Sequence, residues 1–261
     1  MSEQGVPAAY GWMGRVLRID LTTHEVRDYP WSADDRRTWL GGKTMAARIL
    51  ADLLPGREDG PRPTVDPFGP ENVVVIATGP LTGTGAPSSA RFDISTLSPL
   101  TGLVASSNSG GPFGTYLKRA GYDALVLTGA SSEPVWLEVG ETGVTFHDAS
   151  GVWGLGTTGA QAAMAGAIEA RCGTLTIGPA GEHRVRYASV LSGERAAGRA
   201  GTGAVLGAKN VKGIAAWGDR TVAVAHPEKY REYLKRWTAS LKAHPIAGGS
   251  LPALGTAGFV E

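Results

Sequence analysis

The sequence predicts an α+β fold, and three observations lead to that class. Short apolar runs, several of them closed by Gly-Pro, are typical of buried strands. Residues 43–54 and 158–170 have the amphipathic or alanine-rich pattern of helices. The 261 residues include 38 Gly and 16 Pro without a G-X-Y period, beside a hydrophobic fraction of 42%. This composition excludes collagen-like and disordered chains and indicates a globular protein whose backbone often bends sharply or approaches a neighbour closely.

The expected elements follow in chain order. Residues 12–20 and 25–29, joined by Leu-Thr-Thr-His, predict a hairpin. Ser32 is expected to cap a short helix, and the helix over 43–54 ends at Pro55-Gly56. The pattern predicts, further along, a loop at 56–70, strands at 72–78, 91–96, 124–128, 135–139, 174–177 and 185–191, and helices at 115–120 and 158–170.

Residues 106–114, SSNSGGPFG, are too polar and too rich in glycine to be expected in a core element. From Pro227 onward the composition changes, because residues 228–241 form a charged amphipathic pattern typical of a helix. A domain boundary is therefore expected near residues 215–227, with a first domain over 1–215 and the beginning of a helical domain over 216–261.

One pattern occurs twice. The segment VVVIATGPLTG at 73–83 and the segment TLTIGPAGE at 174–182 are both apolar runs closed by Gly-Pro, and each is followed by a strand and a segment with Gly and Arg. A duplicated half-domain would produce this echo. The match is short, and Gly-Pro ends strands in many proteins, so both explanations stay open.

Composition excludes several function classes. Twenty-five basic and 24 acidic residues leave a net charge of +1, which argues against general binding to nucleic acids or membrane surfaces. Cys172 is the single cysteine, so the sequence forms no internal disulfide and no self-contained zinc or iron–sulfur site based on cysteine. No apolar run approaches 18 residues and the start lacks a signal-peptide core, so a cytoplasmic protein is expected.

The strongest constellation pairs glycine-rich segments with arginines and one amide side chain, namely Arg91, Asn108 followed by Ser109-Gly110-Gly111, Arg195 and Arg199. Arginine binds phosphate bidentately, and glycine lets backbone donors approach the same oxygens. The last two arginines would share one face of a helix, or would straddle a ligand from an extended loop. Lys209 and Lys212 would extend the positive field. The pattern predicts a site for a specific phosphorylated ligand.

Other motifs are weaker. Gly154-Leu155-Gly156-Thr157-Thr158-Gly159 fits GxGxxG before a helix, but no acidic residue closes the next strand, where a ribose partner is expected. Gly42-Lys43-Thr44 resembles the end of a P-loop, but Arg37 stands where that motif needs glycine. The five histidines have no ligand spacing, so no residue is assigned a catalytic or metal-binding role.

Several of these segments together resemble the N-terminal domain of the tungsten-dependent aldehyde ferredoxin oxidoreductases. The likeness covers nearly the whole chain. It is carried, in this order, by GWMG at 11–14, ATGPLTGT at 77–84, SARF at 89–92, SPLTG at 98–102, SNSGG at 107–111, GYD at 121–123 and RAAGR at 195–199.

The resemblance implies a first domain of mixed β-sheet and helices, built as a saddle from two related halves that carries a tungsten, or molybdenum, bis-pyranopterin cofactor. Two pterins would suit the repeated pattern. By similarity, the residues that would bind the cofactor are Arg91, Asn108 and Gly110 on one side, and Arg195, Ala196, Gly198 and Arg199 on the other. The metal in this family is held by the pterin dithiolenes, so no protein ligand is expected.

The resemblance also implies a reaction and partners. An aldehyde would be oxidised to a carboxylic acid, and electrons would pass through a [4Fe-4S] cluster to ferredoxin. A single cysteine cannot hold that cluster, so we expect residues 216–261 to begin a truncated second domain, with the cluster supplied by further residues or by a complementary chain. Two alternatives remain: a non-catalytic scaffold or subunit that keeps the fold, and an NAD-binding protein that uses residues Gly154 to Gly159.

Overall fold

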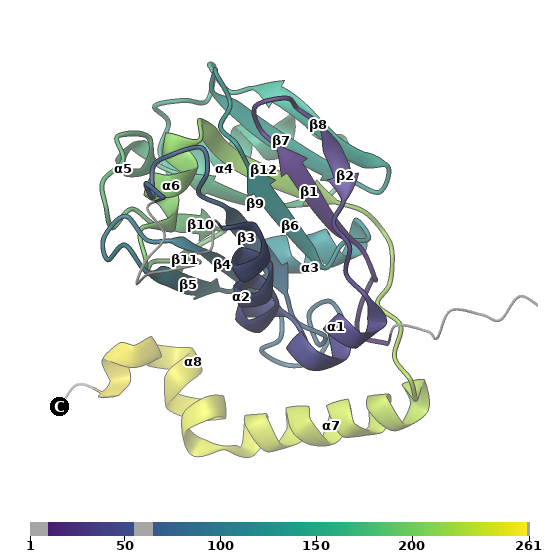
Figure 1. Ribbon diagram of the computed structural model, residues 1–261. Coiled ribbons are helices and arrows are strands. Elements are labelled where there is room, and N and C mark those ends of the chain that lie inside the picture. The colour runs from purple at the N-terminus through teal and green to yellow at the C-terminus, as the bar shows by residue number, and fades with distance from the viewer. Residues whose placement is uncertain (1–9, 55–64, 260–261) are drawn as a thin grey trace, which may run out of the picture.

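The computed structural model describes residues 10–54 and 65–259, and its centre is a pair of six-stranded sheets (Figure 1). Sheet A has the order β2 (Val26–Asp28), β1 (Val16–Asp20), β6 (Ala124–Thr128), β3 (Val74–Thr78), β4 (Phe92–Leu97), β5 (Val104–Ser109). Sheet B has the order β8 (Gly143–Asp148), β7 (Val135–Gly140), β12 (Val211–Trp217), β9 (Cys172–Ile177), β10 (Val190–Ser192), β11 (Arg195–Ala197).

The two sheets have one topology. Each strand of sheet A corresponds to the strand numbered six higher in sheet B, and the order along both sheets is then identical. The strand directions agree as well, because β1 with β6 and β7 with β12 are the parallel pairs, and the other neighbours are antiparallel. The repeated Gly-Pro pattern therefore comes from duplicated halves, since it ends β3 in one half and β9 in the other.

Helices occupy matching places in the two halves. The first six are α1 (Ala33–Trp39), α2 (Gly42–Leu53), α3 (Phe113–Arg119), α4 (Thr157–Gly166), α5 (Pro179–Glu182) and α6 (Thr202–Ala208). Helices α2 and α4 precede β3 and β9, whereas α3 and α6 precede β6 and β12. The α+β class built from two related halves is confirmed.

The core lies between the two sheets. Apolar side chains from both sheets and from α3 and α6 form one buried cluster, which includes Ile19, Phe92, Phe113, Leu137 and Ile214. Helix α2 covers the opposite face of sheet A, and α4 covers the opposite face of sheet B. Strands β4 and β5 lie at one edge of sheet A, and β10 and β11 lie at the corresponding edge of sheet B.

Local sequence explains the first helices. Ser32 and Asp35 form a capping box at the start of α1, with the Ser32 hydroxyl accepting from the Asp35 amide at 3.0 Å. The Ser32 hydroxyl in turn donates to Asp35, which holds the pKa of that carboxyl below its ordinary value. Helix α2 buries Met45, Ile49 and neighbouring apolar residues at helical spacing, as predicted.

Two expectations were wrong and several elements were missed. Residues 104–109 pair with β4 along their whole length as β5, although 106–114 was expected outside the core. Within 185–191, the first residues form turns and the strand begins at Val190. No prediction covered β8, β11, α6 or β12. Helix α4 ends at Gly166 rather than at 170, and most of the predicted loop at 56–70 lies outside the described residues.

A long helix, α7 (Pro227–Ala243), follows the linker after β12 and confirms the helix predicted at 228–241. A π-helical turn (Pro245–Ser250), α8 (Leu251–Leu254) and a 3-10 turn (Gly255–Phe259) continue from it along one side of the domain (Figure 1). None of the α7 residues is buried. Within the described parts of the chain, no helix is long and apolar enough to cross a bilayer. The expected division into domains stays a prediction.

Candidate functional site

The edges of the two halves meet where β5 ends. Gly111, with φ +98°, lies so close to β10 that a Cβ there would collide with Ser192. The Phe113 amide donates to the Ser192 hydroxyl at 3.3 Å, and the Arg199 amide donates to the Ser107 hydroxyl at 3.0 Å. Glycine is needed at this position both for its backbone conformation and for the close approach. These contacts bring the two predicted Gly/Arg segments, far apart in sequence, to one surface.

Arg91, at the start of β4, forms the first arm of this surface. Its Nε donates to Asn108 Oδ1 at 2.6 Å, and Asn108 Nδ2 donates to the Phe92 carbonyl at 3.3 Å. Asn108 lies opposite Asp93 in the β4–β5 register. Both Arg91 and Asn108 are exposed, so the amide fixes Nε while the guanidinium group stays accessible to a ligand.

Gly110 lies between arginines from different halves. A Cβ at this glycine would stand 3.7 Å from Arg91 Nη1 and 3.7 Å from Arg195 Cγ. Its missing side chain therefore leaves the space between these two arginine side chains unfilled, and this space is called the gap below. The predicted residues Arg91, Asn108, Gly110 and Arg195 are neighbours in space.

The second arm is the β10–β11 hairpin, whose turn consists of Gly193 and Glu194. Gly193 has φ +58°, a conformation that favours glycine. Gln161 on α4 fixes the turn through two hydrogen bonds. Its Oε1 accepts from the Gly193 amide at 2.7 Å, and its Nε2 donates to the Gly193 carbonyl at 3.2 Å. Thr174 on β9 donates to the same Oε1 at 3.1 Å. The turn that presents Arg195 is therefore fixed at both of its backbone polar groups.

Arg195 begins strand β11 and Arg199 follows its end, so of the two arrangements considered the extended one is observed. Ala196 and Gly198 are exposed between them, whereas Ala197 is buried. A Cβ at Gly198 would have no neighbour closer than 3.6 Å, so the backbone there is open to a ligand. The predicted residues of the second half thus lie on β11 and directly after it, where Arg199 contacts β5.

The charge of this surface is not neutralised by any carboxylate of residues 10–54 and 65–259. Among the described residues, none of Arg91, Arg195 and Arg199 forms an ion pair with a carboxylate. Unpaired arginines beside bare backbone suit an anionic ligand.

Lys209 and Lys212 do not extend this field, contrary to expectation, because both are buried. Lys212 is paired with Glu182. Lys209 Nζ donates to the carbonyls of Gly129 at 2.6 Å and Pro70 at 3.3 Å. Burial lowers the pKa of Lys209 to about 8. Lys212 thus lies in the interior of the second half, whereas Lys209 reaches from the second half to carbonyls of the first, and their position in GAKNVKG gave no sign of either.

A cavity of about 460 Å³ lies beside Arg91. Its wall includes Gly41 and Gly79 from the backbone of the first half, and Trp237 from α7. Asp93 is the acidic residue of its lining. The cavity is lined in part by the loop that follows β3, so a ligand in contact with Arg91 has further space beside this loop.

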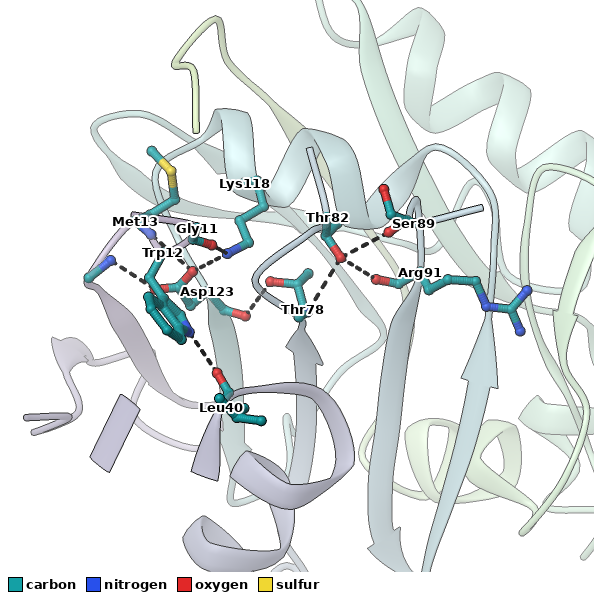
Figure 2. Close-up of polar contacts among 12 residues, drawn as sticks. Gly11, Trp12, Met13, Leu40, Thr78, Thr82, Ser89, Arg91, Lys118 and Asp123 are labelled. Carbon is teal, nitrogen blue, oxygen red and sulfur yellow. Dashed lines mark hydrogen bonds and ion pairs between the residues drawn. The ribbon is translucent and has the colours of Figure 1, made fainter. Parts of the chain in front are cut away.

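Figure 2 shows the polar network behind this loop, which sequence reasoning missed. Asp123 is buried and accepts from Lys118 Nζ at 2.5 Å and from the amides of Met13 at 3.0 Å and Gly14 at 2.8 Å. Burial lowers the pKa of Lys118, and the charge of Asp123 opposes that shift. Thr78 donates through both its amide and its hydroxyl to the Asp123 carbonyl, at 2.9 Å each. The segment GYD at 121–123 was noted in the sequence as part of the family resemblance, but a buried ion pair at Asp123 was not predicted.

The GxGxxG segment does not form a dinucleotide-binding unit. The strands before and after it, β8 and β9, are separated in sheet B by β7 and β12. In a Rossmann unit these two strands would be parallel, and adjacent or nearly adjacent in the sheet. The Gly154 amide already donates to the Glu182 carboxylate, at 3.0 Å to each oxygen.

The described residues contain no group of three or more His, Cys, Asp or Glu side chains placed to hold a metal ion. Cys172 is half-buried at the start of β9, and burial raises the pKa of its thiol. A metal at this surface would therefore need ligands from elsewhere.

Comparison with known proteins places the chain in a family. The model of the aldehyde ferredoxin oxidoreductase N-terminal domain matches residues 16–218, and the chain belongs to this oxidoreductase family. The match spans both sheets, the contact between β5 and the β10–β11 hairpin, and the two arms.

Individual relatives agree. The chain is 41% identical to the tungsten-containing aldehyde ferredoxin oxidoreductase of Pyrococcus abyssi, over 97% of this chain and 41% of the relative. It is 30% identical to an aliphatic sulfonate oxidoreductase, WOR-like subunit, of Pyrococcus furiosus, over 87% of this chain and 38% of the relative. A solved structure of the active site complex BamBC of benzoyl coenzyme A reductase, in complex with 1,5-dienoyl-CoA, superposes with a TM-score of 0.84 at 37% identity, over 89% of this chain and 35% of that one. The chain spans about two fifths of the length of these relatives.

Proposed function

We propose that this domain is the base on which a tungsten, or molybdenum, bis-pyranopterin cofactor lies in an enzyme that oxidises aldehydes to carboxylic acids. The single observation that carries the proposal is the pair of unpaired arginine arms, one from each half, that flank the bare backbone of Gly110. Family membership and the tungsten-containing relatives support it.

Each predicted residue has a place in this proposal. Arg91, fixed by Asn108, would donate to a cofactor phosphate from the first half, and Arg195 and Arg199 would do so from the second. Gly110, Ala196 and Gly198 would let the cofactor approach the backbone. The chemistry supports this assignment, because the cofactor carries phosphates and the arginines of this surface have no acidic partner among the described residues.

When bound, the cofactor would supply the two-electron chemistry of aldehyde oxidation, while this chain orients it and sets its electrostatic surroundings. A [4Fe-4S] cluster would be held by residues outside this sequence, because the sequence has one cysteine. Electrons would pass to ferredoxin or a similar protein. The sulfonate oxidoreductase relative is described as a subunit, and the similar solved structure is described as a complex. Both descriptions favour a second version of this proposal, in which a complementary chain carries the cluster.

The test is cofactor retention. Tungsten and pterin are measured per protein chain after isolation from tungstate-supplied cells, together with any chain that co-purifies. Arg91→Ala and Arg195→Ala each remove one charge-assisted contact, so the affinity is expected to fall roughly tenfold or more. Arg27→Ala on β2, at the opposite edge of sheet A, is the matched control and should load normally. Normal loading of both arm variants would refute the proposal.

A further inference from the structure

The loop between β3 and β4, residues 79–91, carries Arg91 at its end and is held mostly by short-range hydrogen bonds between its own residues, apart from the contact of Thr84 with Tyr230 of α7 at 2.7 Å. It is rich in Gly, Ser, Thr and Pro, and Gly83 and Gly85 have φ of +82° and +86°. Leu81 and Ser88 are exposed. A segment of this kind loses much conformational entropy when it is ordered, so a fixed Arg91 needs a specific restraint.

Thr82 supplies a restraint at both ends of the loop (Figure 2). Its side chain is almost fully buried, with 2% of the residue exposed. The hydroxyl oxygen accepts from the Gly79 amide at 3.3 Å, and the hydroxyl lies within donating distance of the carbonyls of Ser89 at 3.1 Å and Arg91 at 2.9 Å. One atom therefore joins the first residue of the loop to its last.

Both ends of this restraint are connected to further hydrogen bonds. Beyond Gly79, Thr78 is bonded to the carbonyl of Asp123, which belongs to the buried pair with Lys118. At the other end, the Arg91 carbonyl is held by Thr82 while its side chain bonds Asn108 at 2.6 Å. Two connections therefore fix the backbone of Arg91: the following residue, Phe92, pairs with Thr78 in the β3–β4 ladder, and the Thr82 hydroxyl holds the Arg91 carbonyl from the loop side. The corresponding turn of the second half has Gly181 in the GPxx position of Thr82, so this hydroxyl is particular to the first half.

We infer that Thr82 is a positioning residue for cofactor binding. Its hydroxyl holds the Arg91 arm in the orientation that binds a cofactor phosphate. This inference rests on the proposed function. A small displacement of a binding group is enough to lose much of its contribution, because hydrogen bonds weaken steeply with distance and angle. Thr82 itself is buried and is not expected to touch the cofactor.

The experiment compares Thr82→Val, which keeps the shape and removes the hydroxyl, with Thr82→Ser, which keeps the hydroxyl. Hydrogen exchange of the loop and tungsten content are measured on protein isolated with its co-purifying chains. In the valine variant the Gly79 amide should exchange about tenfold faster or more, and tungsten content should fall as in Arg91→Ala. The serine variant should behave as wild type in both measurements. If the valine variant is too unstable to isolate, Thr82→Cys, with its weak thiol donor, replaces it.

A double variant separates positioning from general stability. If Thr82 acts through Arg91, Thr82→Val combined with Arg91→Ala loads no less tungsten than Arg91→Ala alone. Multiplicative losses, normal loading of Thr82→Val, or equal impairment of the serine and valine variants would overturn the inference while the proposed function stands. If Arg91→Ala and Arg195→Ala both load normally, the proposed function fails and this inference fails with it.

Discussion

The buried Lys118–Asp123 pair gives the sharpest stability prediction. The two side chains are 0% and 1% exposed, and their ion pair measures 2.5 Å. Replacing Asp123 with Asn leaves the Lys118 ammonium buried without a counter-charge. Removing one partner of a buried pair costs about 3–5 kcal/mol. Asn also has one acceptor oxygen where Asp has two. The Met13 and Gly14 amides donate to different oxygens of Asp123, so one of these donors would lose its acceptor.

Lys118→Met is expected to cost less than Asp123→Asn, because the carboxylate keeps its two backbone donors. Lys118→Met combined with Asp123→Asn removes both charges, so its cost should be well below the sum of the single variants, with a coupling energy of about 1–3 kcal/mol.

The assay is urea unfolding of the wild type, both single variants and the double variant at one pH, with the free energy of unfolding extrapolated to zero denaturant. A cost of Asp123→Asn below about 1 kcal/mol would refute the assignment of a charged, mutually dependent pair, since a surface ion pair is worth no more than that. Additive single-variant costs would refute it as well.

Three further predictions concern the site and the second half. Gly110→Val should leave thermal stability nearly unchanged, because a Cβ meets its neighbours at 3.7 Å, but should lower tungsten content by filling the gap between the arms. Lys209 has a pKa lowered from 10.5 to about 8, so between these pH values the unfolded chain binds more protons than the native one. The stability of the wild type relative to Lys209→Met should therefore rise with pH across this window, by up to about 3 kcal/mol, and a flat difference in denaturant titrations would contradict the assignment. Gln161→Leu removes both contacts with Gly193, and exchange at that amide should become roughly tenfold faster while the β4 amides stay protected.

Local patterns predicted much of the fold. The hairpin of β1 and β2, the cap of α1, the amphipathic α2 and the apolar strands β3, β6 and β7 were predicted because each has a strong short-range signal. Two of the missed elements have mainly small or polar side chains. Strand β5 reads VASSNS and helix α6 reads TGAVLGA, and neither has a periodic apolar face, since their positions are set by packing between the two halves.

The candidate site was predicted in composition but not in geometry. The residues of both arms were identified, yet sequence alone left open whether Arg195 and Arg199 lie on a helix or in an extended segment. The contact of Gly110 with both arms depends on β5 of one half meeting β11 of the other, a long-range arrangement with no local signal. The burial of Lys209 and Lys212 was missed for a related reason, because their carbonyl and carboxylate partners come from distant segments.

The identical strand order of the two sheets has a consequence for where such a site can exist. Each sheet contributes one edge hairpin, and the gap at Gly110 opens only where the two edges face each other. A polypeptide with a single copy of the repeat would present one arm without its opposite. Covalent duplication places both arms in one chain, so the two arms can differ in sequence: one is held by a threonine hydroxyl and the other by a glutamine amide.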